Sequence, residues 1–187
     1  MEYYNGEPLR HFGDLPAMGA HRYGEKTAFS TSYGQEISYE DLDRKARKVA
    51  NVLIDQGVEP GDRVGLFIPN TLQFPPAYFG IIKAGGVGVP INLRMDPDSM
   101  VYVVNNSEMD VMVASDKVPG GSAEDVAAEA GVGTVLLPGG GDAEIVEDYD
   151  ALVEEASEEL DRPERDFEDV AVQPYTSGTT GNPKGVL

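Results

Sequence analysis

The spacing of apolar residues along the chain predicts alternating helices and strands. The clearest helix lies between Ser38, a typical capping residue, and Gly57, a typical end signal, and its apolar face repeats every three or four positions: Leu42, Ala46, Val49, Ala50 and Leu53. Further helices are predicted at 14–24, 74–84, 97–106, 122–130 and 149–160. Short apolar runs predict strands at 63–68, 87–91, 110–114, 134–137 and 169–173, and a hairpin at 27–31 and 36–38.

This alternation predicts the fold class. Strands that alternate with helices favour an α/β fold with a mostly parallel sheet flanked by helices on both faces. A chain of 187 residues is long enough for one such domain with a substantial core. The pattern weakens between 138 and 169, where Asp142 to Asp169 holds fourteen acidic residues against Arg162 and Arg165. We interpret 138–169 as an acidic, linker-like segment exposed to solvent. An acidic metal site is the alternative, but no spacing in the segment matches a calcium loop.

Charge excludes several classes of partner. The chain has 33 acidic and 14 basic residues and a formal net charge of −19. Such a surface repels nucleic acid and anionic membranes, so neither is expected as a partner. Because the acids are spread over nearly the whole chain while the apolar periodicity is intact, we hypothesise a folded protein adapted to high salt.

The remaining composition narrows the chemistry further. There is no cysteine, which excludes disulfides and thiolate catalysis, and His11 and His21 are the only histidines, so the sequence predicts no metal site within the chain. The first residues lack a basic region followed by an apolar one, and no apolar stretch is long enough to span a membrane. We therefore expect a cytoplasmic protein.

The stretch whose residue types suggest a binding site is a loop after the predicted strand 169–173, with the sequence Tyr175-Thr-Ser-Gly-Thr-Thr-Gly-Asn-Pro-Lys-Gly185. Glycine allows positive φ and close approach of a ligand, and we expect this of Gly178, Gly181 and Gly185. The loop also has four hydroxyl side chains and one lysine, the components of an anion cradle. It is not a Walker loop, because the residue after Lys184 is glycine rather than serine or threonine.

This stretch resembles the phosphate-binding signature of the adenylate-forming (AMP-binding) enzymes, which include acyl-CoA synthetases. Segments at 38–42, 57–64 and 83–92 resemble the same family, so the resemblance extends from about residue 27 to the end. It implies that 1–187 is the N-terminal portion of an adenylation domain and ends at the phosphate-binding loop 175–185. The residues implied to hold the β- and γ-phosphates of ATP are Thr176, Ser177, Gly178, Thr179, Thr180, Gly181 and Lys184.

The resemblance also implies a two-step ligase reaction. The carboxylate of a small-molecule acid attacks the α-phosphate of Mg²⁺-bound ATP, and pyrophosphate leaves. The thiol of CoA then captures the acyl group of the acyl-adenylate, with AMP as the leaving group. The acyl pocket, the Mg²⁺ ligand and a catalytic lysine of the family lie in later parts of the enzyme, so we expect no catalytic residue within 1–187 and no turnover by this chain alone. The missing C-terminal part of the same enzyme is therefore the expected partner.

Alternatives remain open at this point. The chain is either a fragment of a longer protein or a truncated reading frame, and a non-catalytic or vestigial nucleotide-binding module is the second interpretation. An aryl-CoA ligase and a peptide-synthetase adenylation domain fit the same signature. The identity of the acid and the oligomeric state do not follow from these residues.

Overall fold

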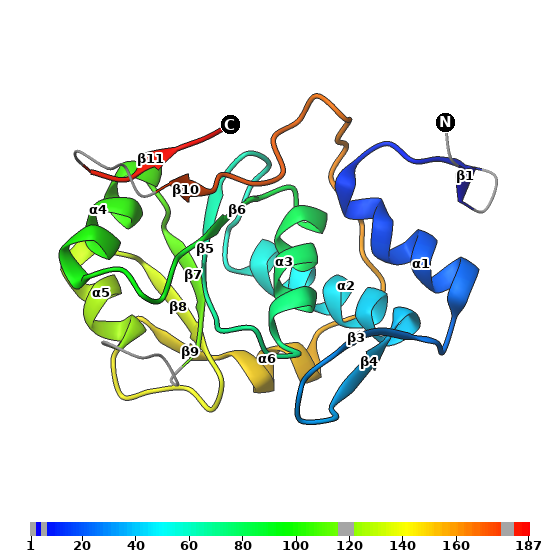
Figure 1. The fold of residues 1–187 in the computed structure, drawn as a ribbon, viewed down its shortest axis with the longest axis horizontal. Helices are drawn as coiled ribbons and strands as arrows, with labels where there is room; N and C mark the ends of the chain where they lie inside the picture. The colour runs from blue at the N-terminus through cyan, green and yellow to red at the C-terminus, as the bar shows by residue number, and fades with distance from the viewer. Residues whose placement is uncertain (1–2, 5–6, 116–121, 177–181) are drawn as a thin grey trace.

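The computed structural model describes residues 3–4, 7–115, 122–176 and 182–187. Its centre is a parallel sheet with the strand order β6-β5-β7-β8-β9, in which every neighbouring pair runs in the same direction (Figure 1). The five strands are β5 (Arg63–Phe67), β6 (Val87–Pro90), β7 (Val111–Ala114), β8 (Thr134–Leu137) and β9 (Val146–Asp148). The predicted parallel sheet is confirmed. The sequence did not predict β9, because it lies in the acidic run and has no apolar stretch.

Helices cover both faces of this sheet, as the alternation predicts (Figure 1). One face packs against α2 (Tyr39–Asp55), α3 (Phe74–Lys83) and α6 (Tyr149–Glu155), and the other against α4 (Pro97–Ser107) and α5 (Ala123–Ala130). Side chains alternate along β5: Val64 and Leu66 pack in the core on the α2, α3 and α6 side, and Phe67 packs in the core on the α4 and α5 side. None of the described helices is both long enough and apolar enough to cross a bilayer.

Helix α2 forms for the reasons that its sequence indicates. The hydroxyl of Ser38 accepts a hydrogen bond of 3.0 Å from the amide of Asp41, and Gly57 follows the helix with a φ of 88°. The predicted apolar face is buried in the core, and Gly80 of α3 lies so close to Val49 that a Cβ at Gly80 would be 2.5 Å from that side chain. The two helices therefore approach closely only because residue 80 lacks a side chain.

The N-terminal part lies beside α2 at one end of the molecule (Figure 1). It contains the helix α1 (Leu15–Tyr23), preceded by the short 3₁₀ helix η1 (Phe12–Asp14), and the predicted hairpin of β3 (Thr27–Ser30) and β4 (Glu36–Ser38). A further short antiparallel pair, β1 (Tyr3–Tyr4) and β2 (Glu7–Pro8), was not predicted. These elements border α2 and the chain that returns from α6.

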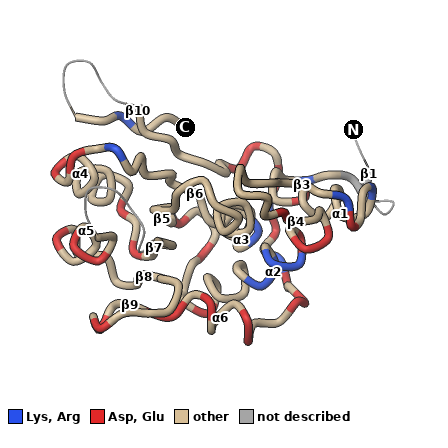
Figure 2. The backbone as a smooth tube through the Cα atoms, turned by 60° about the horizontal axis from the view of Figure 1, so that its bottom comes forward, with Lys and Arg blue, Asp and Glu red and all other residues tan. Residues whose placement is uncertain are grey.

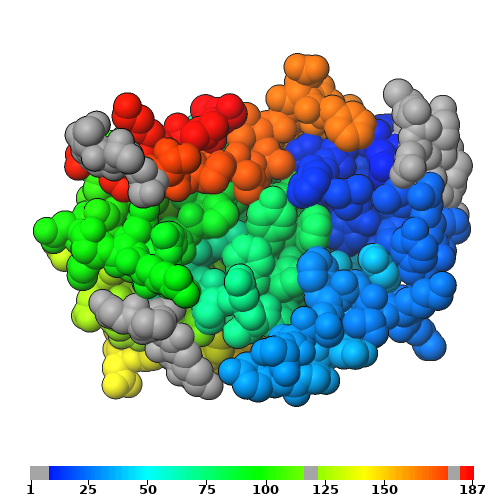
Figure 3. All heavy atoms as spheres, in the orientation of Figure 1, coloured from blue at the N-terminus to red at the C-terminus, as the bar shows by residue number. Residues whose placement is uncertain are grey.

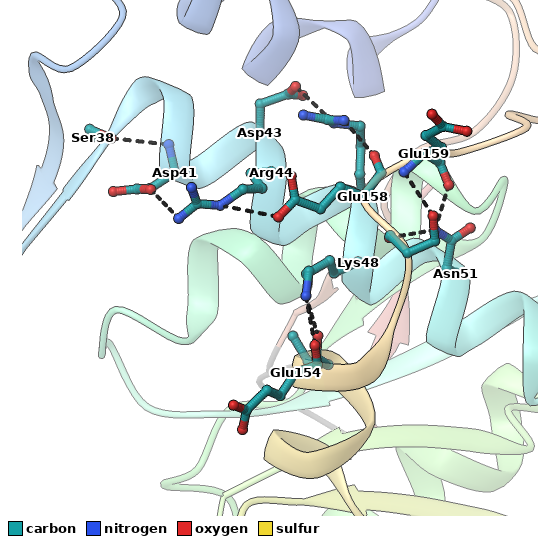
Figure 4. Close-up of polar contacts among 12 residues, drawn as sticks. Ser38, Asp41, Asp43, Arg44, Lys48, Asn51, Glu154, Glu158 and Glu159 are labelled. Atoms are coloured by element: carbon teal, nitrogen blue, oxygen red, sulfur yellow. Dashed lines mark hydrogen bonds and ion pairs between the residues drawn. The ribbon is translucent and has the colours of Figure 1, made fainter.

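The chain that follows α6, here called the connecting segment (residues 156–172), runs along α2. The predicted helix to residue 160 is wrong in its extent, because α6 ends at Glu155. Beyond that point, side chains of α2 donate hydrogen bonds to backbone carbonyls: Asn51 Nδ2 lies 2.8 Å from the oxygens of both Ser157 and Glu159 (Figure 4). These contacts stabilise a non-helical backbone after α6.

The second half of the connecting segment crosses the N-terminal part and returns to the sheet. Arg162 forms an ion pair with Asp14, and Arg165 donates to the carbonyl of Gly85 at 2.7 Å. Figure 3 shows this stretch, in orange, standing out beside the N-terminal residues in blue. The predicted strand at 169–173 is reduced to a single parallel bridge between Val172 and Gly88, so it lies at the sheet edge and is only partly buried.

Candidate functional site

The candidate site lies where the parallel strands β5 and β6 end. A hollow of about 680 Å³ opens there, lined by the loops that follow both strands and by Pro174 and Tyr175. The polar side chains that line it include those of Asn70, Asn92 and Arg94. Because ligands of open α/β sheets bind outside the carboxyl ends of the strands, this is the expected edge for a binding site. Its size is that of a small-molecule pocket.

A short hairpin borders this hollow. Strand β10 (Tyr175–Thr176) pairs antiparallel with β11 (Lys184–Gly185), which places Tyr175 opposite Gly185 and Thr176 opposite Lys184 (Figure 1). The Thr176 hydroxyl lies 3.4 Å from the carbonyl oxygen of Lys184, and both residues are exposed. The amide of Val186 continues the pairing by donating to Pro174 at 3.0 Å.

Of the seven residues predicted to hold phosphate, the structure brings together the first and the last. Thr176 and Lys184 face each other across the hairpin. The other five lie outside the described residues: Ser177, Gly178, Thr179, Thr180 and Gly181. Thr176 brings a hydroxyl and Lys184 an ammonium group, and both residues are exposed to solvent. An anion from solution can therefore reach both of them.

The role of Gly185 differs from the prediction. Its φ is not positive, and it belongs to an extended strand. Glycine is required there because of packing: a Cβ would lie 2.7 Å from Nε2 of Gln173 and 3.1 Å from the ring of Tyr175. The conformational reason given for this glycine was therefore wrong, and close approach between the hairpin and the chain before it is the reason that the structure supports.

Four side chains that the sequence analysis did not select connect the hairpin to the domain. Arg63 Nε donates to Gln173 Oε1 at 3.2 Å, and Gln173 Nε2 donates to the hydroxyl of Tyr175 at 3.1 Å. That hydroxyl donates to Asn106 Oδ1, at the end of α4, at 2.8 Å. We call these four residues the polar relay. The available signal was Gln173, a polar residue that ends the apolar run 170–172.

Burial affects the one ionisable acceptor of the relay, the Tyr175 phenol. Gln173 is only 8% exposed, and Tyr175 packs against the core on the α4 and α5 face. Burial raises the pKa of the Tyr175 phenol, and the hydrogen bond from Gln173 opposes this shift in part. A phenol of ordinary pKa is already protonated at neutral pH, and the raised pKa keeps the Tyr175 proton available to Asn106 at higher pH as well.

Other ionisable groups serve the fold instead of this site. Lys83 Nζ lies 2.9 Å from Asp43 Oδ1 between α2 and α3, on the opposite sheet face from Tyr175. Burial lowers the pKa of Lys83, and pairing with Asp43 opposes this shift. Within the described parts of the chain, no three or more histidine, aspartate or glutamate side chains are grouped to hold a metal ion. We therefore assign no described residue to Mg²⁺.

Comparison with known proteins supports the interpretation of the signature. The AMP-binding enzyme family model matches residues 17–187. The chain is 32% identical over 167 residues to a 3-oxocholest-4-en-26-oate–CoA ligase of Rhodococcus rhodochrous, a match that covers 87% of this chain and 30% of that protein. The chain thus spans about a third of the length of the relatives that it matches.

Solved structures give the same result. A long-chain-fatty-acid–CoA ligase from Archaeoglobus fulgidus has a TM-score of 0.80 at 27% identity, covering 99% of this chain and 37% of that one. An anthranilate CoA ligase solved with anthranoyl-AMP has a TM-score of 0.84 at 24% identity, over 96% and 35% of the two chains, and it shows the shared fold. With the family model extending over all but the first residues, the chain belongs to the AMP-binding enzyme family.

Proposed function

We propose that the protein containing these residues activates a carboxylic acid with ATP and transfers the acyl group to CoA. The single observation that supports the proposal is the hairpin β10–β11, in which Thr176 pairs with Lys184 next to Tyr175, a residue that lines the hollow at the carboxyl edge of the sheet. The resemblance to CoA ligases over most of the chain supports it. The nature of the acid, fatty or aryl, is left to experiment.

The proposed roles follow from the chemistry of each side chain. When bound, ATP would supply an electrophilic phosphate for the acid, and CoA the thiol that accepts the acyl group. Lys184 neutralises phosphate charge, and the hydroxyl of Thr176 donates to a phosphate oxygen together with the residues at 177–181. Donors fixed in place before the reaction stabilise developing negative charge without reorganisation, which is the contribution that we expect from this loop.

Residues 1–187 are, in this proposal, the N-terminal portion of an adenylation domain that ends at the loop 175–185. The acyl pocket, the Mg²⁺ ligand and the catalytic lysine would come from later residues. Reading the coding sequence beyond Leu187 tests this. Continuation into an acidic magnesium-binding motif and a C-terminal lysine supports a ligase, whereas a stop codon supports the alternative of a non-catalytic nucleotide-binding remnant.

ATP–pyrophosphate exchange by the full-length protein tests the function directly. A panel of fatty, sterol-derived and aryl acids should reveal acid-dependent exchange with at least one class. Thr180→Ala and Lys184→Ala should each lower kcat/KM for ATP by about ten- to a hundredfold, since a hydrogen bond to a charged group is worth roughly 1.5–3 kcal/mol. Lys45→Ala, at an exposed position of α2, is the matched control and should retain full activity.

The acidic surface leads to a separate proposal about the environment. Figure 2 shows acidic residues along most elements, with basic residues gathered mainly around α1 and α2. We propose a cytoplasmic enzyme, where ATP and CoA are available, adapted to high salt that screens the repulsion among 33 acidic residues. Full stability and solubility of the complete protein without added salt would contradict the adaptation.

A further inference from the structure

The polar relay has a fixed direction of donation. Arginine has no acceptor, so Arg63 must donate, and Gln173 must turn its carbonyl oxygen towards Arg63. The amide nitrogen of Gln173 then points to Tyr175, whose hydroxyl accepts that bond and is left with its own proton for Asn106. Hydrogen bonds that run in one direction polarise each other, so loss of one member weakens the others.

The relay also lies directly against both strands of the hairpin. Tyr175 belongs to β10, and Gly185 of β11 lies so close to Gln173 that no Cβ fits between them. Backbone bonds anchor Gln173 itself, because its amide donates to the carbonyl of Gly88 at 2.9 Å. Gln173 therefore contacts both strands of the hairpin and is itself bonded to the edge strand β6.

We propose that Gln173 is a positioning residue for nucleotide binding, and that Tyr175 and Asn106 complete its action by holding β10 against α4. This rests on the proposed function of the hairpin. The relay does not touch the nucleotide. It fixes Thr176 and Lys184 in one position, so that their donors need no reordering when ATP binds, and reordering is a cost that lowers affinity.

The test uses two variants of the full-length protein, one that interrupts the relay at the buried Gln173 and one that interrupts it at the exposed Asn106. Gln173→Met replaces the buried amide with an apolar chain of similar length, and Asn106→Leu removes the acceptor at an exposed helix position that tolerates substitution. Asn106→Asp keeps an acceptor for Tyr175 and should rescue the wild-type behaviour. Asn105→Leu, at the neighbouring exposed position of α4, is the matched control.

Two measurements distinguish positioning from a purely structural role. The KM for ATP should rise about three- to tenfold in Gln173→Met and Asn106→Leu while kcat changes by less than about twofold, the range expected for loss of one hydrogen bond that acts through binding. Hydrogen–deuterium exchange should be faster in the peptide covering 173–186, with little change in α2. Asn106→Asp and Asn105→Leu should match the wild type in both.

Two results would overturn the inference. The first is an unchanged KM for ATP in both interrupted variants, including the case in which they are less stable, because a structural role alone predicts that outcome. The second is unchanged deuterium uptake in 173–186. If the wild type shows no ATP–pyrophosphate exchange with any acid, the proposed function fails. The hydrogen exchange measurement still decides whether Gln173 holds the hairpin.

Discussion

The connecting segment and the hairpin β10–β11 are both fixed by polar contacts, but the contacts differ in kind. Just after α6 the connecting segment is held through its backbone: Asn51 of α2 donates to the carbonyl oxygens of Ser157 and Glu159, and Lys48 donates to that of Glu154 at the end of α6 (Figure 4). The hairpin is held through side chains, by the polar relay. Every residue has a carbonyl, so the contacts that Asn51 makes with Ser157 and Glu159 do not depend on which side chains stand at those two positions. The polar relay that holds the hairpin depends on the side chain of each of its four residues.

The largest effect is expected from crowding the hairpin. In Gly185→Ala the new Cβ would lie 2.7 Å from the Gln173 amide, so either this buried, hydrogen-bonded amide or β11 must shift. We expect a loss of stability of about 1–3 kcal/mol, the usual range for overpacking. The KM for ATP of the full-length protein should rise by more than tenfold. Adding Gln173→Ala removes the obstructing atoms and should recover part of the stability in urea unfolding. A fully stable, fully active Gly185→Ala variant contradicts the close approach.

A smaller effect is expected where the connecting segment is held. Asn51→Ala removes two hydrogen bonds of 2.8 Å to exposed carbonyls, which water can then solvate, so we expect a loss of about 1–2 kcal/mol in urea unfolding. The KM for ATP should not change, because the hairpin is held separately. Lys45→Ala on the same helix serves as control. An Asn51→Ala protein with altered KM would show that the two regions are coupled.

The pH dependence of stability probes the place where the connecting segment meets the N-terminal part. Burial lowers the pKa of His11, and Arg165 and Arg162 lower it further, while Asp169 and Asp166 oppose them. The folded state therefore binds fewer protons than the unfolded state, and stability falls as the pH drops below about 6.5. His11→Asn, whose amide oxygen can replace Nδ1 as the acceptor for Gly13, should lose less stability between pH 7 and 5.

The control for this prediction is His21→Asn, at an exposed position. It should show the same decrease in stability with acid as the wild type. Thermal unfolding at a series of pH values measures both variants. Identical profiles for wild type and His11→Asn would mean that His11 is not the group responsible.

The smallest effect is expected from the acidic side chains of the α6 end and the connecting segment. Glu154→Gln and Glu159→Gln should each change stability by less than about 0.5 kcal/mol, because α2 binds the carbonyls of these residues instead of their carboxylates. Each variant should slightly reduce the dependence of stability on KCl. A loss as large as that of Asn51→Ala would show that the carboxylates hold the segment.

Much of the fold could be predicted from local pattern. The face of α2 from Leu42 to Leu53 and four of the five strands of the sheet have apolar spacing that specifies their structure without reference to other parts of the chain. The end of α6 could not be predicted, since residues 156–160 have helical spacing but are drawn out by contacts with α2, more than a hundred positions earlier. The strand β9 has no apolar pattern of its own.

The candidate site divides in the same way. The signature predicted Thr176 and Lys184 as site residues from residue types and order, and this stays a prediction, whereas the contacts among Gln173, Arg63 and Asn106 became visible only in the structure. Arg63 and Gln173 are 110 positions apart, and no periodicity links them. The sequence by itself determined the alternating elements, the family signature and the acidic surface, because burial and composition act locally. Only the tertiary structure decided which polar groups meet, because hydrogen bonds require atoms within about 3 Å, and the packing of the sheet sets those distances.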